Sequence, residues 1–155
     1  VNFFIDTTNS IKPGENPDSL EYGSKKAIIT DYYVIDEYGK VSNAVIKGTE
    51  FTIHMKVEFL EDVEAPIFAF TFKNVKGTEI TGTNTMFEKA FLASCKKGDK
   101  KDISFTQKMD LQGGEYLMSF GVTGYESDTF TVYHRLYDIL NITVISEKIR
   151  LDIMI

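Results

Sequence analysis

The sequence predicts an all-β protein, an antiparallel β-sandwich. Short segments alternate apolar and polar residues with a period of two, and β-branched and aromatic residues dominate them. Pairs that favour turns, such as Gly113-Gly114, separate these segments, and no long amphipathic helix pattern interrupts them. The alternation is clearest in the stretch FTIHMKVEF, whose apolar positions are Phe51, Ile53, Met55, Val57 and Phe59.

The strands are predicted from this alternation, in order along the chain, at residues 27–35, 51–59, 67–73, 79–83, 103–109, 115–123, 130–133 and 139–145. The stretch MFEKAFLASCKKG is expected to form one or two helical turns or an irregular crossover between the sheets. The closing stretch KIRLDIMI places its apolar residues on one face and is predicted to be an extra terminal strand. An apolar strand at a chain end invites pairing with another subunit, so this strand is a candidate for an edge shared in a dimer.

The domain organisation follows from length and local composition. The chain has 155 residues, of which 43% are hydrophobic, enough for one domain that buries about 70% of its unfolded surface. The stretch NSIKPGENPDSLEYG contains Pro-Gly and Asn-Pro pairs, which break regular structure. We therefore expect residues 1–20 to be a linker or arm and residues 21–155 to form the sandwich.

Composition also argues against several classes of partner. The net charge is −6 and no cluster of Lys and Arg is long enough to follow a phosphate backbone, so nucleic acid is not an expected partner. No apolar run approaches the roughly 18 residues of a membrane helix, so direct membrane insertion is not expected. The single cysteine, Cys95, excludes an internal disulfide and fits a reducing compartment, which makes the cytoplasm the expected location.

Signatures of catalysis are not found. The sequence has no phosphate-binding loop, no nucleophile elbow and no metalloprotease or EF-hand motif. His54 is expected on the exposed face of its strand, and His134 beside Arg135 in a polar turn. Cys95 precedes two lysines, but a partly buried and unreactive thiol is preferred over a reactive thiolate. We predict no catalytic residue, no metal ligand and no cofactor.

The two sheets are expected to expose different outer faces. The strands at 51–59 and 103–109 expose a charged face, whereas the strands at 67–73, 115–123 and 139–145 expose a face nearly free of charge. That face consists of Ile67, Ala69, Thr71, Leu117, Ser119, Gly121, Thr123, Ile139, Asn141 and Thr143. Such a surface suits either a subunit interface or a polyhydroxylated ligand, because sugar hydroxyls pair with neutral donors and acceptors.

The stretch TGTNT, residues 81–85, has the same neutral chemistry, with Thr83, Asn84 and Thr85 next to one another. These side chains can bind a sugar, but Thr and Asn at a strand end also commonly bond their own backbone. Both interpretations stay open at this point.

The order of several motifs resembles the C-terminal domain of Wzt-type proteins, the ATP-binding subunits of ABC transporters that export bacterial polysaccharides such as O-antigens. The motifs are EYGSKKAIITDYYVIDEYGK, KGTEFTIHMKVEF, APIFAFTFKNVKGTEITGTNT, GGEYLMSFGV and YDILNITVI, which together extend over about residues 20–146. The stretch GTNT is the most recognisable of them. Their order and spacing carry the resemblance more than any single motif does.

The resemblance implies an immunoglobulin-like sandwich. It also implies a cytoplasmic module at the inner face of the cell membrane that binds the exported glycan and has no catalytic activity. It also implies a homodimer, an upstream ATPase domain and a membrane subunit of the transporter as partners. The sequence has no Trp to stack on a sugar, so tyrosines must replace it. The candidate ligand-binding residues are Tyr33, Gly82, Thr83, Asn84, Thr85, Tyr125, Asn141 and Thr143, with Gly82 allowing the backbone to turn.

Two other functions remain open from the sequence. The domain can be a purely structural sandwich that dimerises the transporter ATPase, in which case the neutral face is buried between subunits. It can also be an extracellular carbohydrate-binding or adhesion module, which a signal peptide in the full gene would indicate.

Overall fold

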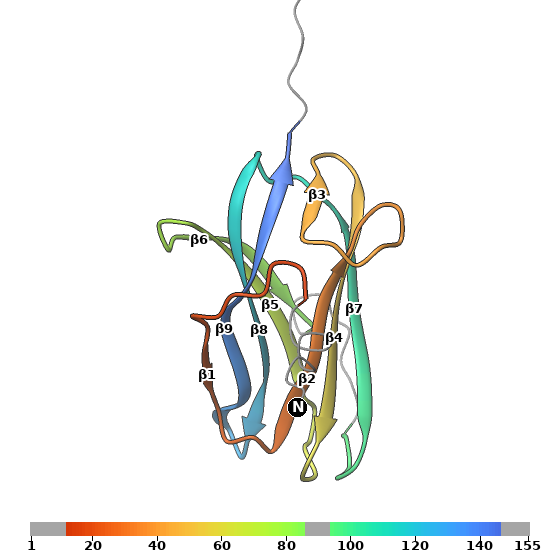
Figure 1. Ribbon diagram of the computed structural model, residues 1–155. Coiled ribbons are helices and arrows are strands. Elements are labelled where there is room, and N and C mark those ends of the chain that lie inside the picture. The colour runs from red at the N-terminus through yellow and green to blue at the C-terminus, as the bar shows by residue number, and fades with distance from the viewer. Residues whose placement is uncertain (1–11, 86–93, 147–155) are drawn as a thin grey trace, which may run out of the picture.

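The computed structural model describes residues 12–85 and 94–146, which form two β-sheets packed face to face (Figure 1). The larger sheet has the strand order β1-β9-β8-β5-β6, with β3 pairing alongside β9, and the smaller sheet has the order β2-β4-β7. The part of the chain that is described contains no helix. The strands are β1 (Leu20–Tyr22), β2 (Ala27–Ile35), β3 (Ala44–Ile46), β4 (Glu50–Phe59), β5 (Ile67–Asn74), β6 (Glu79–Asn84), β7 (Lys100–Lys108), β8 (Gly114–Glu126) and β9 (Thr129–Ile145).

The predicted all-β sandwich is confirmed, and so is the assignment of strands to sheets. Strands β5, β8 and β9 lie in one sheet and β4 and β7 lie in the other. All pairs are antiparallel except β3 with β9. The short strands β1 and β3 were not predicted, because three residues are too few to show a period of two.

The prediction of separate strands at 130–133 and 139–145 was wrong, because β9 runs unbroken through the polar residues between them. Ser127 and Asp128 form the turn that joins β8 to β9, with φ values of +51° and +69°. Two central residues with positive φ suit the right-handed twist of a hairpin. Asp138, with φ +55°, lies where the β8–β9 register shifts between Met118 and Phe120. The irregularity disturbs the alternation, and the sequence pattern therefore resembled a turn.

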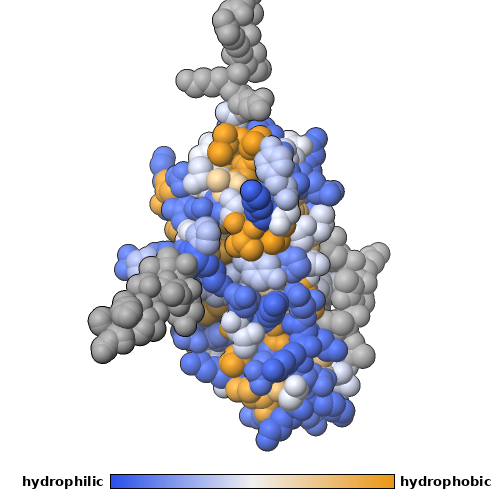
Figure 2. Space-filling view, turned by 45° about the vertical axis from the view of Figure 1, so that its right-hand side comes forward, coloured by the Kyte–Doolittle hydropathy of each residue, from blue (hydrophilic) through white to orange (hydrophobic). Residues whose placement is uncertain are grey.

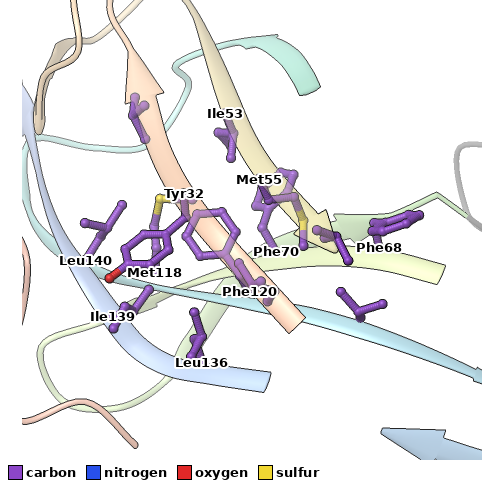
Figure 3. Packing of buried hydrophobic residues seen from close by; sticks show 14 of the residues in the cluster. Tyr32, Ile53, Met55, Phe68, Phe70, Met118, Phe120, Leu136, Ile139 and Leu140 are labelled. Carbon is purple, nitrogen blue, oxygen red and sulfur yellow. The ribbon is translucent and has the colours of Figure 1, made fainter. Parts of the chain in front are cut away.

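The core lies between the two sheets and is rich in aromatic and branched side chains (Figure 3). Phe70 and Phe120 of the larger sheet face Met55 and Tyr32 of the smaller one, and the Tyr32 ring lies 5.6 Å from that of Phe120. Burial of each large side chain is worth about 1.5–3 kcal/mol. On the face seen in Figure 2, one group of apolar residues lies at the upper end and another toward the lower end. Hydrophilic side chains separate the two groups, so this face has no single continuous apolar patch.

The segment at residues 12–19, predicted as part of an arm, packs along β9. The backbone N–H of Asn141 donates to the carbonyl of Gly14 at 2.7 Å, and that of Asn16 donates to the carbonyl of Ile139 at 3.0 Å. The hydroxyl of Tyr32 donates to the Glu15 carboxylate at 2.5 Å. This segment therefore belongs structurally to the sandwich, while the division of the chain at residue 20 stays a prediction.

Two predicted elements lie wholly or largely outside the described residues. The predicted terminal strand at 148–155 is outside them, as is most of the predicted helical turn or crossover at 86–98. Within the latter, Cys95 forms a backbone bridge with Val63, with N···O distances of 2.9 and 2.8 Å. Cys95 is 1% exposed, and burial raises the pKa of its thiol, which fits the predicted unreactive side chain.

The two histidines differ in their surroundings. His54 lies on the outer face of β4, stacked on Tyr33 at 4.9 Å and 3.1 Å from the Asp102 carboxylate. Its predicted place on the outward side of the strand is thus confirmed. The predicted turn around His134 was wrong, because His134 is 3% exposed and lies within β9.

Candidate ligand-binding site

A hollow of about 270 Å³ lies on the outer face of the larger sheet, over the middle of β5, β8 and β9. Small residues form its floor. Ala69 of β5 is in register with Gly121 of β8, and Thr71 is in register with Ser119. Directly opposed residues of neighbouring strands point to the same face, so three small side chains and a glycine lie together and leave a depression. Its lining is Ala69, Phe70, Thr71, Lys73, Glu79, Ser119, Phe120, Gly121, Arg135 and Tyr137.

Arg135 forms one wall of the hollow. It is in register with Gly121, and its Nε lies 3.5 Å from the place where a Cβ on Gly121 would stand. The Arg135 side chain therefore lies over the glycine. Its Nη1 donates to the hydroxyl of Tyr137 at 3.3 Å, and its guanidinium carbon lies 5.9 Å from the Tyr137 ring.

A salt bridge forms the second side of the hollow. The Lys73 ammonium lies 3.0 Å from the Asp138 carboxylate, and the backbone N–H of Asp138 donates to Ser119 Oγ at 2.8 Å. These contacts hold the irregular part of β9 around Asp138 against β8 and β5. Glu79 of β6 is in register with Lys73 and adds a carboxylate at the far end.

Strand β1 extends this face beyond Arg135. Tyr22 is in register with Arg135, and Leu20 is in register with Tyr137. Tyr22 is 62% exposed and Leu20 is 70% exposed. Tyr137 thus lines the hollow, and Tyr22 on the adjacent strand stands beside Arg135, just beyond the lining residues. Sequence reasoning missed both of them, because β1 shows no periodicity and Tyr137 lay in the supposed turn.

The described residues contain no group of three His, Cys, Asp or Glu side chains placed to hold a metal ion. Over the same ranges, no helix has the length and apolar character needed to cross a membrane. The chemistry that the hollow offers consists of a hydroxyl group, the phenol ring of Tyr137, the guanidinium group of Arg135, the Lys73–Asp138 ion pair and the Glu79 carboxylate.

Comparison with known proteins gives the family. The family model described as the Wzt C-terminal domain matches residues 18–152. The chain belongs to the Wzt C-terminal domain family. The crystal structure of the C-terminal domain of Wzt matches with a TM-score of 0.80 and 26% identity, covering 88% of this chain and 84% of that one.

Other solved structures are less similar to this Wzt-family domain. The CARDB domain of the PF1109 protein from Pyrococcus furiosus, crystallised in complex with di-metal ions, has a TM-score of 0.43 and 16% identity, covering 76% of this chain and 90% of that one. A β-glucosidase from Listeria innocua has a TM-score of 0.43 and 8% identity, covering 86% of this chain and 17% of that one. The search of curated proteins gave no match. We draw no functional conclusion from likenesses of this size.

Two of the predicted site residues lie beside the hollow of this Wzt-family domain. Asn84 of β6 is in register with Ala69, and Gly82 with Thr71, so both border the floor. A Cβ on Gly82 would lie 2.5 Å from the carbonyl oxygen of Phe70. The glycine is thus needed for close approach of two strands, and the predicted role in a turn was wrong.

The other two predicted site residues of the TGTNT stretch face inward or bond the backbone. Thr83 is in register with the buried Phe70, on the inner side of the sheet. Thr85 is 6% exposed, and its Oγ1 accepts a hydrogen bond from the backbone N–H of Phe68 at 3.1 Å. For Thr85 the geometry matches the alternative interpretation, in which the side chain satisfies a strand end.

The remaining predicted residues are not brought to the hollow. Asn141 lies beside a second depression of about 330 Å³, which is also lined by Asn16 of the N-terminal segment. Thr143 donates to the Glu115 carboxylate at 2.9 Å. Tyr33 stacks on a histidine of the smaller sheet, and Tyr125 packs near the β8–β9 turn. The predicted set therefore divides among separate surfaces.

The prediction of a nearly charge-free outer face was wrong for the larger sheet. Lys73 and Arg135 line its hollow, and Glu115 is in register with Thr143 on the same face. Arg135 was missed because its segment resembled a turn. Several residues expected on that face are also buried, and these are Ile67, Ser119, Thr123 and Ile139.

Proposed function

We propose that this domain is a non-catalytic carbohydrate-binding module that recognises the polysaccharide exported by an ABC transporter. The observation that carries the proposal is the hollow over Ala69 and Gly121 on the outer sheet face, which Tyr137 lines and beside which Tyr22 stands next to Arg135. Membership of the Wzt C-terminal domain family supports it. A volume of about 270 Å³ is near the lower end of the range of roughly 300–1,000 Å³ for small-molecule sites. A hollow of this size suits a polymer that is held by one or a few of its sugar units.

The chemistry of the hollow matches that of a sugar ring. A pyranose has hydroxyl groups around its edge and C–H groups on its faces. Thr71 offers a hydroxyl at the floor, and Asn84 lies one strand away with an amide. Tyr22 and Tyr137 provide flat rings for the C–H faces, which replaces the missing Trp.

The domain would act by tethering. A module that holds the glycan beside the transporter raises its local concentration there without any chemical step. We propose that it works as a homodimer on the cytoplasmic side of the membrane, joined to an upstream ATPase domain and, through it, to the membrane subunit. ATP hydrolysis would occur in that upstream domain.

The proposal is tested by calorimetric or NMR titration with the polysaccharide purified from the strain that encodes this chain. Ala69→Phe fills the floor of the hollow and is expected to abolish saturable binding. Thr106→Phe places the same ring on the outer face of the other sheet, where Thr106 is exposed on β7, and is expected to leave binding intact. A wild-type domain that is folded and shows no binding at saturating polymer would disprove the proposal.

A second function, dimerisation of the transporter ATPase without glycan contact, is favoured by one observation. Leu20 and Tyr22 are exposed apolar residues on β1, which is the terminal strand in the order of the larger sheet. Such an edge can pair with another chain. If so, Tyr22→Lys would shift the domain to monomer in analytical ultracentrifugation, and the titration with polymer would stay silent for every variant.

A further inference from the structure

Arg135 is the cation of the hollow that has no carboxylate partner among the described residues. The other lining cation, Lys73, is held by Asp138 at 3.0 Å. The ion pairs found in residues 12–85 and 94–146 involve Lys12, Lys25, Lys26, His54, Lys73 and His134, and none involves Arg135. The contact of Arg135 is instead with a neutral group, the Tyr137 hydroxyl, at 3.3 Å.

The position of this guanidinium is set by its neighbours. Gly121 leaves room for the side chain to lie across β8, and Tyr137 accepts one of its hydrogen bonds. Tyr22 stands next to it on β1. A guanidinium has five N–H donors in a planar fork, so most of its donors remain available for a ligand in the hollow. The fork matches the paired oxygens of a carboxylate or phosphate.

Of the carboxylates at the hollow, Glu79 lies away from Arg135 and Asp138 is paired with Lys73. Glu79 is in register with Lys73, whose partner on β8 is Leu117. Leu117 is four residues from Gly121, or roughly 13 Å along the strand. In a chain with a net charge of −6, Arg135 therefore provides a local positive site at one end of the hollow.

We propose that the ligand of this hollow carries a negative group, a sugar carboxylate or phosphate, and that Arg135 binds it through paired hydrogen bonds. This inference rests on the proposed function and names the class of glycan. A wholly neutral sugar would cover the guanidinium without matching its charge, and covering an unpaired charge is unfavourable. An anionic sugar supplies the missing partner while Tyr22 and Tyr137 contact its ring.

The test compares three forms of the polysaccharide purified from the strain that encodes this chain: native, carboxyl-reduced and dephosphorylated with aqueous hydrogen fluoride. The variants are Arg135→Gln, which removes the charge, and Arg135→Lys, which keeps the charge but loses the fork. Lys56→Gln on the outer face of β4 is the matched control, since it removes a cation from the other sheet. Thermal unfolding checks that each variant is folded.

We expect wild-type affinity to fall on the order of tenfold or more when either the anionic group or the Arg135 charge is removed, as for a charged hydrogen bond. The two losses should not add, because they remove the same contact. The affinity of the Arg135→Lys variant should lie between those of the wild type and Arg135→Gln. The Lys56→Gln variant should bind as the wild type does. Whichever chemical treatment weakens binding identifies the group as a carboxylate or a phosphate.

Equal binding of native and treated polymer, a native polymer without anionic groups that still binds, or unchanged binding by Arg135→Gln would overturn the inference and leave the proposed function standing. Failure of the wild-type domain to bind any of the three forms would overturn both. The two failures are thereby distinguished.

Discussion

His134 of β9 accepts a hydrogen bond from the backbone N–H of Ile29 in β2, with 2.8 Å between Nδ1 and the nitrogen. A buried imidazole therefore ties the larger sheet to the smaller one. Its Nε2 lies 2.6 Å from the carboxylate of Glu21 in β1. Because Nδ1 accepts, the ring proton is on Nε2 and is donated to Glu21. The same strand β1 carries Tyr22 to the edge of the hollow, so this contact also supports the candidate site.

Replacing His134 with Ala is expected to destabilise the fold by about 1–3 kcal/mol, because the N–H of Ile29 would be left buried without a partner. Urea unfolding should show a lower midpoint with an unchanged slope. His54→Ala is the control, since His54 lies on an outer face, and it should change stability by no more than about 0.5 kcal/mol. Equal losses in the two variants would contradict the role assigned to His134.

Stability is expected to fall above pH 10 through Tyr133, whose side chain is fully buried in β9. Burial, with the nearby Glu126 carboxylate, raises the pKa of Tyr133 from 10.0 to about 12. The unfolded chain releases this proton first, so the stabilisation is complete below pH 10 and is lost as the pH rises toward 12. The difference in stability between wild type and Tyr133→Phe should shrink over that window.

The measurement is urea unfolding at several pH values from 8 upward, with Tyr38→Phe as the control. Tyr38 is 73% exposed, so removing its hydroxyl should leave the pH dependence as in the wild type. A constant difference between wild type and Tyr133→Phe up to pH 12 would show that this hydroxyl ionises normally.

Gly82→Ala is expected to destabilise the pairing of β5 and β6, because its Cβ would lie 2.5 Å from the backbone oxygen of Phe70. We expect a loss of about 1–3 kcal/mol, as for overpacking at a site that cannot relax. Gly121→Ala on the same sheet face is the control, since the nearest atom to its new Cβ is 3.5 Å away. Chemical denaturation of both variants tests the contrast, and a stable Gly82→Ala domain would contradict it.

Tyr137→Ala is expected to weaken polysaccharide binding by roughly threefold to tenfold, the size of one lost aromatic contact of about 0.5–1.5 kcal/mol. Tyr22→Ala should have a similar effect, because Tyr22 stands beside Arg135, just beyond the lining residues of the hollow. Tyr33→Ala is the control, since that ring stacks on His54 on the other sheet. Calorimetric titration measures all three, and a loss in Tyr33→Ala alone would move the binding site to the smaller sheet.

The fold was predictable in its main features because a half-buried strand leaves a local mark. In β4 the apolar residues from Phe51 to Phe59 alternate with polar ones, and the structure buries each of the apolar ones. Strand β2 has the predicted bounds Ala27–Ile35. The pattern failed at Asp138, where a residue with positive φ broke the alternation and β9 was divided in two.

The candidate site was predictable only in part. Of the residues proposed from the sequence, Gly82 and Asn84 lie beside the hollow on the larger sheet, and which face binds a ligand stays a prediction. Arg135, Tyr137 and Tyr22 were not identified, because the first two lay in the supposed turn and the third in a strand of three residues. Thr85 was selected for its hydroxyl, which the structure uses for a backbone bond.

The sequence by itself determined the all-β class, most strand positions, the sheet to which the major strands belong and the family resemblance. These properties depend on local periodicity and on the order of short motifs. The tertiary structure decided which side chains meet across strands. The register that places Arg135 over Gly121 and beside Tyr22 joins residues far apart in the chain. Register depends on pairing and bulges, and a shift of one residue moves a side chain to the opposite face of the sheet.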